Sequence, residues 1–81
     1  MEIKKKYIGK YTGQDGERQY YMIQKDSYYG VELLEGSNPY LISTIEWFSE
    51  DPSHTQAFIE LLCQHGASSI HVSELIDNYI L

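Results

Sequence analysis

The chain has 81 residues, a formal net charge of −6 and a single cysteine, Cys63. This length fits one domain, residues 1–81, with a thin core. One cysteine cannot form the disulfides that stabilise small secreted proteins, so we expect a reducing, cytoplasmic compartment. The apolar runs are far shorter than the about 20 residues of a membrane helix, and residues 1–10 carry lysines without an apolar run behind them. We therefore expect neither a membrane span nor a signal peptide.

The charges are divided unevenly along the chain. All six basic residues lie within residues 1–25, beside three acidic ones, which gives this segment a net charge of +3. Residues 26–81 hold nine acidic residues and no Lys or Arg, a net charge of −9. The sequence therefore predicts a strongly dipolar molecule and not a uniformly acidic one.

Residues 1–47 are predicted to form a sheet. Residues 3–11 alternate in character, which is typical of a strand, and residues 12–17 contain two glycines and predict a turn. Residues 19–25, rich in aromatic and β-branched side chains, are the second predicted strand. Residues 28–35 and 40–47 are the third and fourth, separated by a loop that ends at Pro39.

Residues 50–81 are predicted to form two helices. Pro52 after two acids favours a helix start, although Ser53 with Gln56 also matches a capping box, so the first helical residue stays open. Gly66 favours a left-handed end to this helix. A second helix follows residues 68–69, because its apolar residues have the spacing of one helical face: Val72, Leu75, Ile76, Tyr79 and Ile80. We expect Leu75 and Ile76 to be buried.

Strands followed by helices indicate the α+β class, with helices on one face of an antiparallel sheet. Short connections favour a meander, in which neighbours in sequence are neighbours in space. The predicted architecture is ββββαα, a four-stranded antiparallel meander followed by two C-terminal helices packed on one of its faces.

Several segments also resemble a known family. They are Tyr29–Glu32, Ile42-Ser43 with Ile45, and Ile70–Ile80. Over roughly residues 28–81 the chain resembles a family of short uncharacterised bacterial proteins, a domain of unknown function found mainly in spore-forming Gram-positive bacteria. The resemblance implies a bacterial cytoplasmic protein of about this size. It implies no activity, ligand or catalytic residue.

The residues that could support metal or thiol chemistry are few: Cys63, His54, His65 and His71. Cys63 and His65 are two apart on a predicted helix, which turns their side chains roughly 200° from one another, so they cannot bind one ion together. A second cysteine that could complete a tetrahedral site is missing. We therefore expect no catalytic, cofactor or metal site, and a protein that is not an enzyme.

Tyrosine is the most unusual feature of the composition, with eight residues, seven of them on predicted strands. They are explained either by cross-strand packing or by a surface that binds a partner. If the helices cover one face of the sheet, the other face needs a role. The alternation places the following residues on that uncovered face: Lys4, Lys6, Ile8, Lys10, Tyr20, Met22 and Tyr28.

These features predict a non-enzymatic protein–protein interaction or regulatory module. Its expected partner is another protein or a second copy, as a homodimer. The alternative is a protein linked to nucleic acid, either a weak binder through the strand that carries lysines and tyrosines or an acidic mimic of nucleic acid. Nucleic acid is the less favoured partner, because residues 26–81 would repel phosphates.

Overall fold

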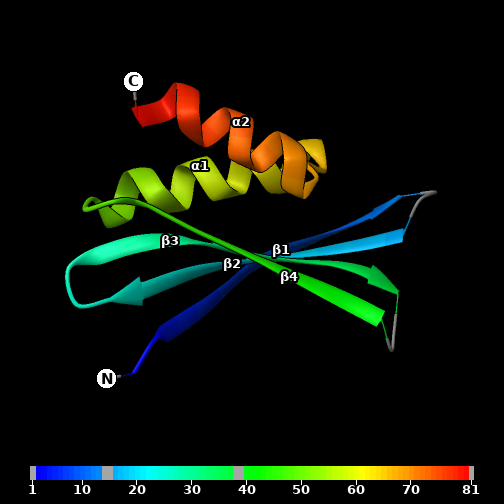
Figure 1. Cartoon of the computed structure of the whole chain (residues 1–81), viewed down its shortest axis with the longest axis horizontal. Coiled ribbons are helices and arrows are strands. Elements are labelled where there is room, and N and C mark those ends of the chain that lie inside the picture. Colours follow the sequence, from blue (N-terminus) through cyan, green and yellow to red (C-terminus); the bar gives the residue numbers. More distant parts are fainter. Residues whose placement is uncertain (1, 14–15, 38–39, 81) are drawn as a thin grey trace.

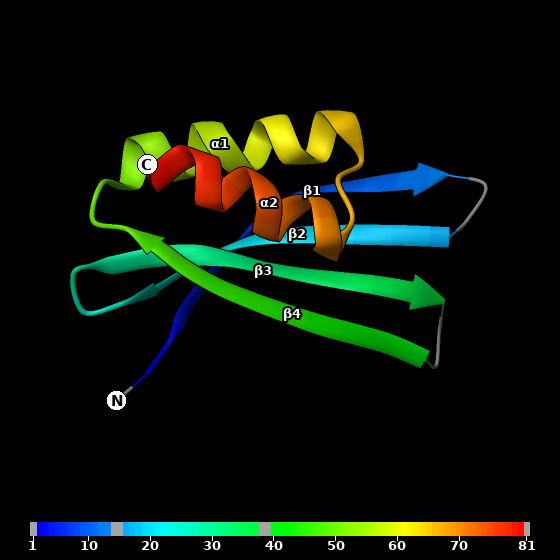
Figure 2. The ribbon, with the colours of Figure 1, turned by 45° about the horizontal axis from the view of Figure 1, so that its top comes forward.

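The structure is a computed structural model that describes residues 2–13, 16–37 and 40–80. Four antiparallel strands form one sheet in the order β1-β2-β3-β4 (Figure 1). Their bounds are β1 Lys4–Gly13, β2 Gly16–Lys25, β3 Tyr28–Ser37 and β4 Tyr40–Ser49. Two helices, α1 (Pro52–His65) and α2 (Ser69–Ile80), lie on one face of this sheet (Figures 1 and 2). The predicted ββββαα architecture is confirmed.

The strands are longer than the sequence predicts at the ends where turns were expected. Gly13 pairs with Gly16, and Ser37 pairs with Tyr40, so residues assigned to loops belong to the ladder. The centres of these two predicted turns, residues 14–15 and 38–39, lie outside the described residues. Strands β2 and β3 are joined by a two-residue turn in which Asp26 has a positive φ of 56°, a conformation that Asp tolerates better than most residues.

Helix α1 has a defined cap at each end. Asp51 precedes Pro52 and accepts a 3.0 Å hydrogen bond from the backbone N–H of His54. Asp51, and not Ser53, is therefore the N-cap residue. At the other end Gly66 adopts φ 62°, and the N–H of Ala67 donates to the carbonyl of Leu62 at 3.0 Å, which satisfies one of the last helical carbonyls.

The core lies between the helices and the sheet. Its buried members are Tyr20, Val31, Leu33, Phe48, Ile59, Leu62, Ala67, Val72 and Ile76. Helix α1 packs over β1, β2 and β3, whereas α2 packs on β4. Phe48 of β4 and Phe58 of α1 make an edge-to-face contact with ring centroids 5.3 Å apart. The core is therefore a single layer of side chains closed mainly by α1.

The second helix packs less tightly than its apolar stripe predicts. Ile76 is buried, as expected, but Leu75 is 43% exposed, so the prediction that Leu75 is buried was wrong. Leu75 instead borders an apolar hollow between the helices, which Leu61 and His65 also line. The side chains of Tyr79 and Ile80 lie outside the described part of the chain. Within that part, no helix has the length and apolar character needed to cross a membrane.

Candidate interaction surface

A β-bulge in β1 decides which side chains face the helices. Tyr7 pairs with Tyr21 and Gly9 pairs with Tyr20, so Ile8 is an extra residue in the ladder. A bulge reverses the alternation of side chains along the strand that contains it. Consequently Ile8 packs on the core, whereas Tyr7 before it and Lys10 after it lie on the opposite face.

Most of the surface predicted from strict alternation is wrong, because the helices cover the face that was expected to be open. Ile8 and Met22 pack against the core, and Tyr20 has no exposed surface. Lys6 also faces the helices, where its Nζ donates a 2.8 Å hydrogen bond to Oε1 of Gln56 on α1. Lys4 shares that face of β1, two residues before Lys6. Of the seven predicted residues, the register leaves only Lys10 and Tyr28 on the face without helices.

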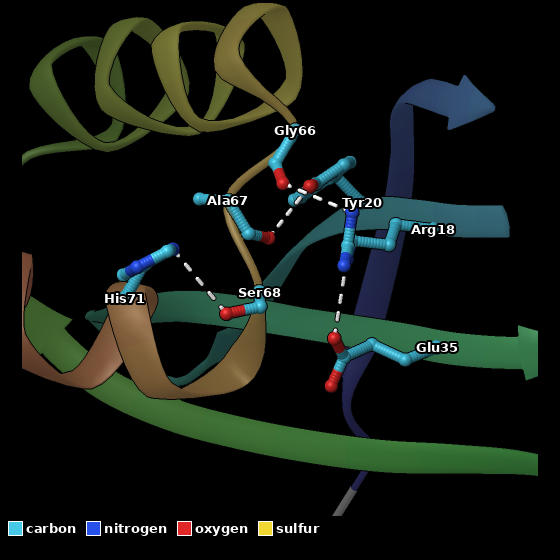
Figure 3. A network of polar contacts seen from close by, with 7 residues as sticks. All are labelled: Arg18, Tyr20, Glu35, Gly66, Ala67, Ser68 and His71. Carbon is cyan, nitrogen blue, oxygen red and sulfur yellow. Dashed lines mark hydrogen bonds and ion pairs between the residues drawn. The ribbon is translucent and has the colours of Figure 1, made fainter. Parts of the chain in front are cut away.

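Tyr20 anchors the connection between the helices (Figure 3). Its hydroxyl donates a 2.7 Å hydrogen bond to the carbonyl of Ala67. Beside it, Arg18 donates from one guanidinium nitrogen to the carbonyl of Gly66 at 3.1 Å and pairs through Nε with Glu35 at 3.2 Å. Burial raises the pKa of Tyr20 to about 12, against a smaller opposing effect of Arg18. Tyr20 is thus a structural residue and not part of an exposed surface.

The face of the sheet opposite the helices, called here the open face, has its own aromatic and aliphatic cluster. The register aligns its members across all four strands: Tyr7, Tyr21, Ile23, Leu34, Leu41, Ile45 and Trp47. Tyr7 and Tyr21 meet edge to face with centroids 5.4 Å apart. Tyr7 is 54% exposed and Ile45 47% exposed, so the cluster presents apolar area to solvent.

A buried carboxylate lies at the centre of the open face. Glu32 is only 7% exposed; Nζ of Lys5 lies 2.6 Å from its Oε1, and the hydroxyl of Ser43 donates to its Oε2 at 2.8 Å. The Lys5 contact is an ion pair, and Oε1 receives no hydrogen bond of regular geometry from the described residues. Burial alone would raise the pKa of Glu32, but Lys5 and Ser43 outweigh it and hold this pKa below its usual range.

A shallow hollow of about 490 Å³ adjoins the open face at the β2–β3 turn. Trp47 and Tyr28 line it together with Lys25, Asp26 and Ser27. Tyr28 is 48% exposed, and with Trp47 it gives the hollow an aromatic lining. An aromatic-lined hollow next to a lysine can receive an apolar side chain that has an acidic neighbour.

The basic residues of the first two strands are largely paired within the molecule. Besides Lys5 and Arg18, Lys10 lies 3.1 Å from Glu17, which raises the pKa of Lys10. This pairing bears on nucleic-acid binding, because a phosphate would have to compete with these carboxylates for each cation.

The thiol lies in the packing between α1 and β1. A Cβ added at Gly9 would come within 2.8 Å of Sγ of Cys63, so the bulged strand approaches the helix very closely. Burial raises the pKa of the Cys63 thiol, which disfavours the nucleophilic thiolate. Among the described residues, no three His, Cys, Asp or Glu side chains are grouped so as to hold a metal ion.

Comparison with protein-family models, with curated proteins and with solved structures finds no match to this chain. The resemblance to a family of short bacterial proteins therefore stays a prediction.

The sequence nevertheless contained signals for the open face. The adjacent pair Tyr20-Tyr21 must place one ring on each face of β2, so one of the two had to lie opposite the helices. Glu32 is the only charged residue in the apolar run 31–34, and a carboxylate there requires a partner. Neither signal identified which of the two faces the helices cover.

Proposed function

We propose that this domain is a non-enzymatic protein-interaction or regulatory module of the bacterial cytoplasm, and that a partner protein binds on its open face. The observation that carries the proposal is the cluster of exposed Tyr7 and Ile45 with half-buried Tyr21 and Trp47, on a sheet face that neither helix covers. Aromatic residues are enriched at the centres of protein interfaces.

The ion pair at the centre of this face supports the same function. A buried, hydrogen-bonded carboxylate gives an apolar surface one fixed polar position, which favours a specific partner over non-specific adhesion. Within the described strands, the open face carries three lysines (Lys5, Lys10, Lys25) and two carboxylates (Glu17, Glu32). This face is slightly basic on an acidic protein, so the partner surface that fits it is apolar with an acidic rim.

The alternative of a protein linked to nucleic acid receives less support. Lys5, Lys10 and Arg18 each pair with a carboxylate of the sheet, and Lys6 bonds to α1. A nucleic-acid binder should lose affinity steeply with added salt, whereas binding through the apolar cluster should persist. Salt dependence of partner binding therefore separates the two functions.

Site-specific photo-crosslinking tests the proposal. A photoreactive phenylalanine analogue replaces Tyr7, and in a matched control it replaces Leu61 of α1, which is 53% exposed against 54% for Tyr7. In a bacterial extract we expect a protein to be crosslinked from position 7 and not from position 61. Excess unmodified protein should compete for it, whereas excess Trp47→Ser protein should not. Equal crosslinking from both positions, or equal competition by both proteins, would reject the open face as the binding surface.

A further inference from the structure

The two edges of the sheet differ in how they are protected. An edge strand exposes unpaired backbone N–H and C=O groups, and proteins prevent unwanted pairing there with lysines, prolines and bulges. Edge strand β1 carries Lys4, Lys5, Lys6 and Lys10 and has the bulge at Ile8. Edge strand β4 contains no lysine and no proline, and its single charge is Glu46. Only β1 carries protecting lysines, and the first half of β4 has neither a lysine nor a bulge.

The unprotected edge is also apolar on both faces. Tyr40 and Ile42 are 81% and 68% exposed on the helix side, and Leu41 and Ile45 are 43% and 47% exposed on the open face. The ladder with β3 is regular from Tyr40 to Trp47, and its irregularity comes only at Phe48. Figure 2 shows β4 outermost, with the end near residue 40 extending past both helices. This half of β4 is a long, regular and apolar template for another strand.

We propose that β4 pairs antiparallel with β4 of a second copy, which joins two sheets into one of eight strands. A two-fold axis at Ser43 places Leu41 opposite Ile45 of the second copy, and Ile42 opposite Thr44. It also places Glu46 opposite Tyr40 of the second copy, so the two Glu46 carboxylates do not face one another. This register uses the whole segment 40–46 and leaves no like charges opposed.

A second copy fits this edge better than a head-to-tail arrangement does. Pairing β4 with β1 of a further copy would repeat without closing and form a filament. The lysines and the bulge of β1 oppose that contact. Pairing of β4 with itself is closed by symmetry after two copies, and it covers Ile42 and its apolar neighbours in a protein whose own core is thin. In the joined sheet both open faces lie on the same side.

The test compares two matched substitutions. Ile42→Lys puts a charge on the helix side of β4, away from the open face, and Ile70→Lys makes the same change on α2, where Ile70 is 71% exposed. Sedimentation velocity over a range of protein concentrations should show a dimer for the wild type and for Ile70→Lys. Ile42→Lys should weaken the dimer at least about 100-fold, with an unchanged circular dichroism spectrum.

A crosslink tests the register without weakening the interface. In a Cys63→Ser background, Ser43→Cys should form a disulfide-linked dimer under mild oxidation, since the two thiols would face one another, and Ile70→Cys should not. A wild-type protein that is monomeric throughout would overturn the edge pairing, as would a dimer that Ile42→Lys leaves intact. Neither result affects the proposed partner binding, because Tyr7, Tyr21 and Trp47 of the open face lie outside the segment 40–46. Conversely, a failure to crosslink a partner from position 7 would not contradict the edge pairing.

Discussion

The hydroxyl of Tyr20 in β2 donates a 2.7 Å hydrogen bond to the backbone carbonyl of Ala67, in the short connection between the two helices. Tyr20 and Ala67 are both buried, so neither the hydroxyl nor the carbonyl can bond to water instead. Their hydrogen bond satisfies both polar groups. This bond attaches the helix connection to the sheet (Figure 3). It also holds the Tyr20 side of β2 toward the helices. The next residue, Tyr21, therefore lies on the open face.

Removing this hydroxyl should destabilise the fold. We expect Tyr20→Phe to lower the free energy of unfolding by about 1–3 kcal/mol, because the buried carbonyl of Ala67 loses its donor. Tyr21→Phe is the matched control: the Tyr21 hydroxyl bonds to Gln19 in a half-buried position, so its loss should cost less than about 0.5 kcal/mol. Urea denaturation at constant m value measures both. Equal costs would contradict the role given to Tyr20.

The same residue predicts a loss of stability at high pH. The pKa of Tyr20 is about 12 in the folded protein, whereas an unfolded tyrosine ionises near 10. Its contribution is fully present below about pH 10 and decreases as the pH rises toward 12, because only the unfolded state releases the proton. The free energy of unfolding should fall between these values less steeply in Tyr20→Phe than in the wild type. Parallel curves would show that Tyr20 is not the group responsible.

The close approach of β1 to α1 predicts a coupled pair of substitutions. Gly9→Ala would bring a Cβ within 2.8 Å of Sγ of Cys63, and we expect it to cost about 1–3 kcal/mol through overpacking. In a Cys63→Ala background the clash is absent, so the cost of Gly9→Ala should largely vanish. A double-mutant cycle by thermal or chemical denaturation measures the coupling. If the stability effects of the two substitutions are additive, Gly9 and Cys63 are not in contact.

Lys5 should control the acid stability of the sheet. Because the pKa of Glu32 is lowered on folding, its contribution to stability is present above about pH 4.5 and is lost as the pH falls through the folded pKa. Lys5→Met removes the main group that lowers this pKa and should cost about 1–3 kcal/mol at pH 7. It should also weaken or reverse the decrease in stability on acidification.

Lys4→Met is the control for Lys5→Met, since Lys4 neighbours Lys5 in sequence but lies on the other face. It should change the free energy of unfolding little at either pH. If the two variants behave alike, Lys5 does not stabilise the ionised form of Glu32.

The order and type of the elements could be predicted from the sequence, because the change of period near residue 50 and the signals at Pro52 and Gly66 are local. The faces of the sheet could not. Alternation along β1 fails at Ile8, where a single extra residue moves every later side chain to the other face. A separate error placed Tyr20 outside: alternation along β2 holds, but the helices cover the face of β2 that was expected to be open.

The exposure of Leu75 likewise could not be predicted from the periodic spacing of apolar residues. Spacing defines an apolar stripe on α2, but the width that is buried depends on how far the neighbouring elements reach around it. Helix α2 packs on β4 at the edge of the sheet, so Ile76 and Val72 are covered and Leu75 remains at the rim of the hollow between the helices.

The fluorescence of Trp47 gives the most direct test that the open face is the binding surface. Trp47 is the only tryptophan of the chain, and it lies at the junction of the open face and the hollow beside Tyr28. The partner recovered by crosslinking can be prepared with its own tryptophans replaced by phenylalanine and titrated into the protein while calorimetry records binding. We predict that the emission of Trp47 shifts to the blue in step with the calorimetric isotherm, as the indole loses contact with water. Binding by calorimetry with an unchanged Trp47 spectrum would contradict the proposal.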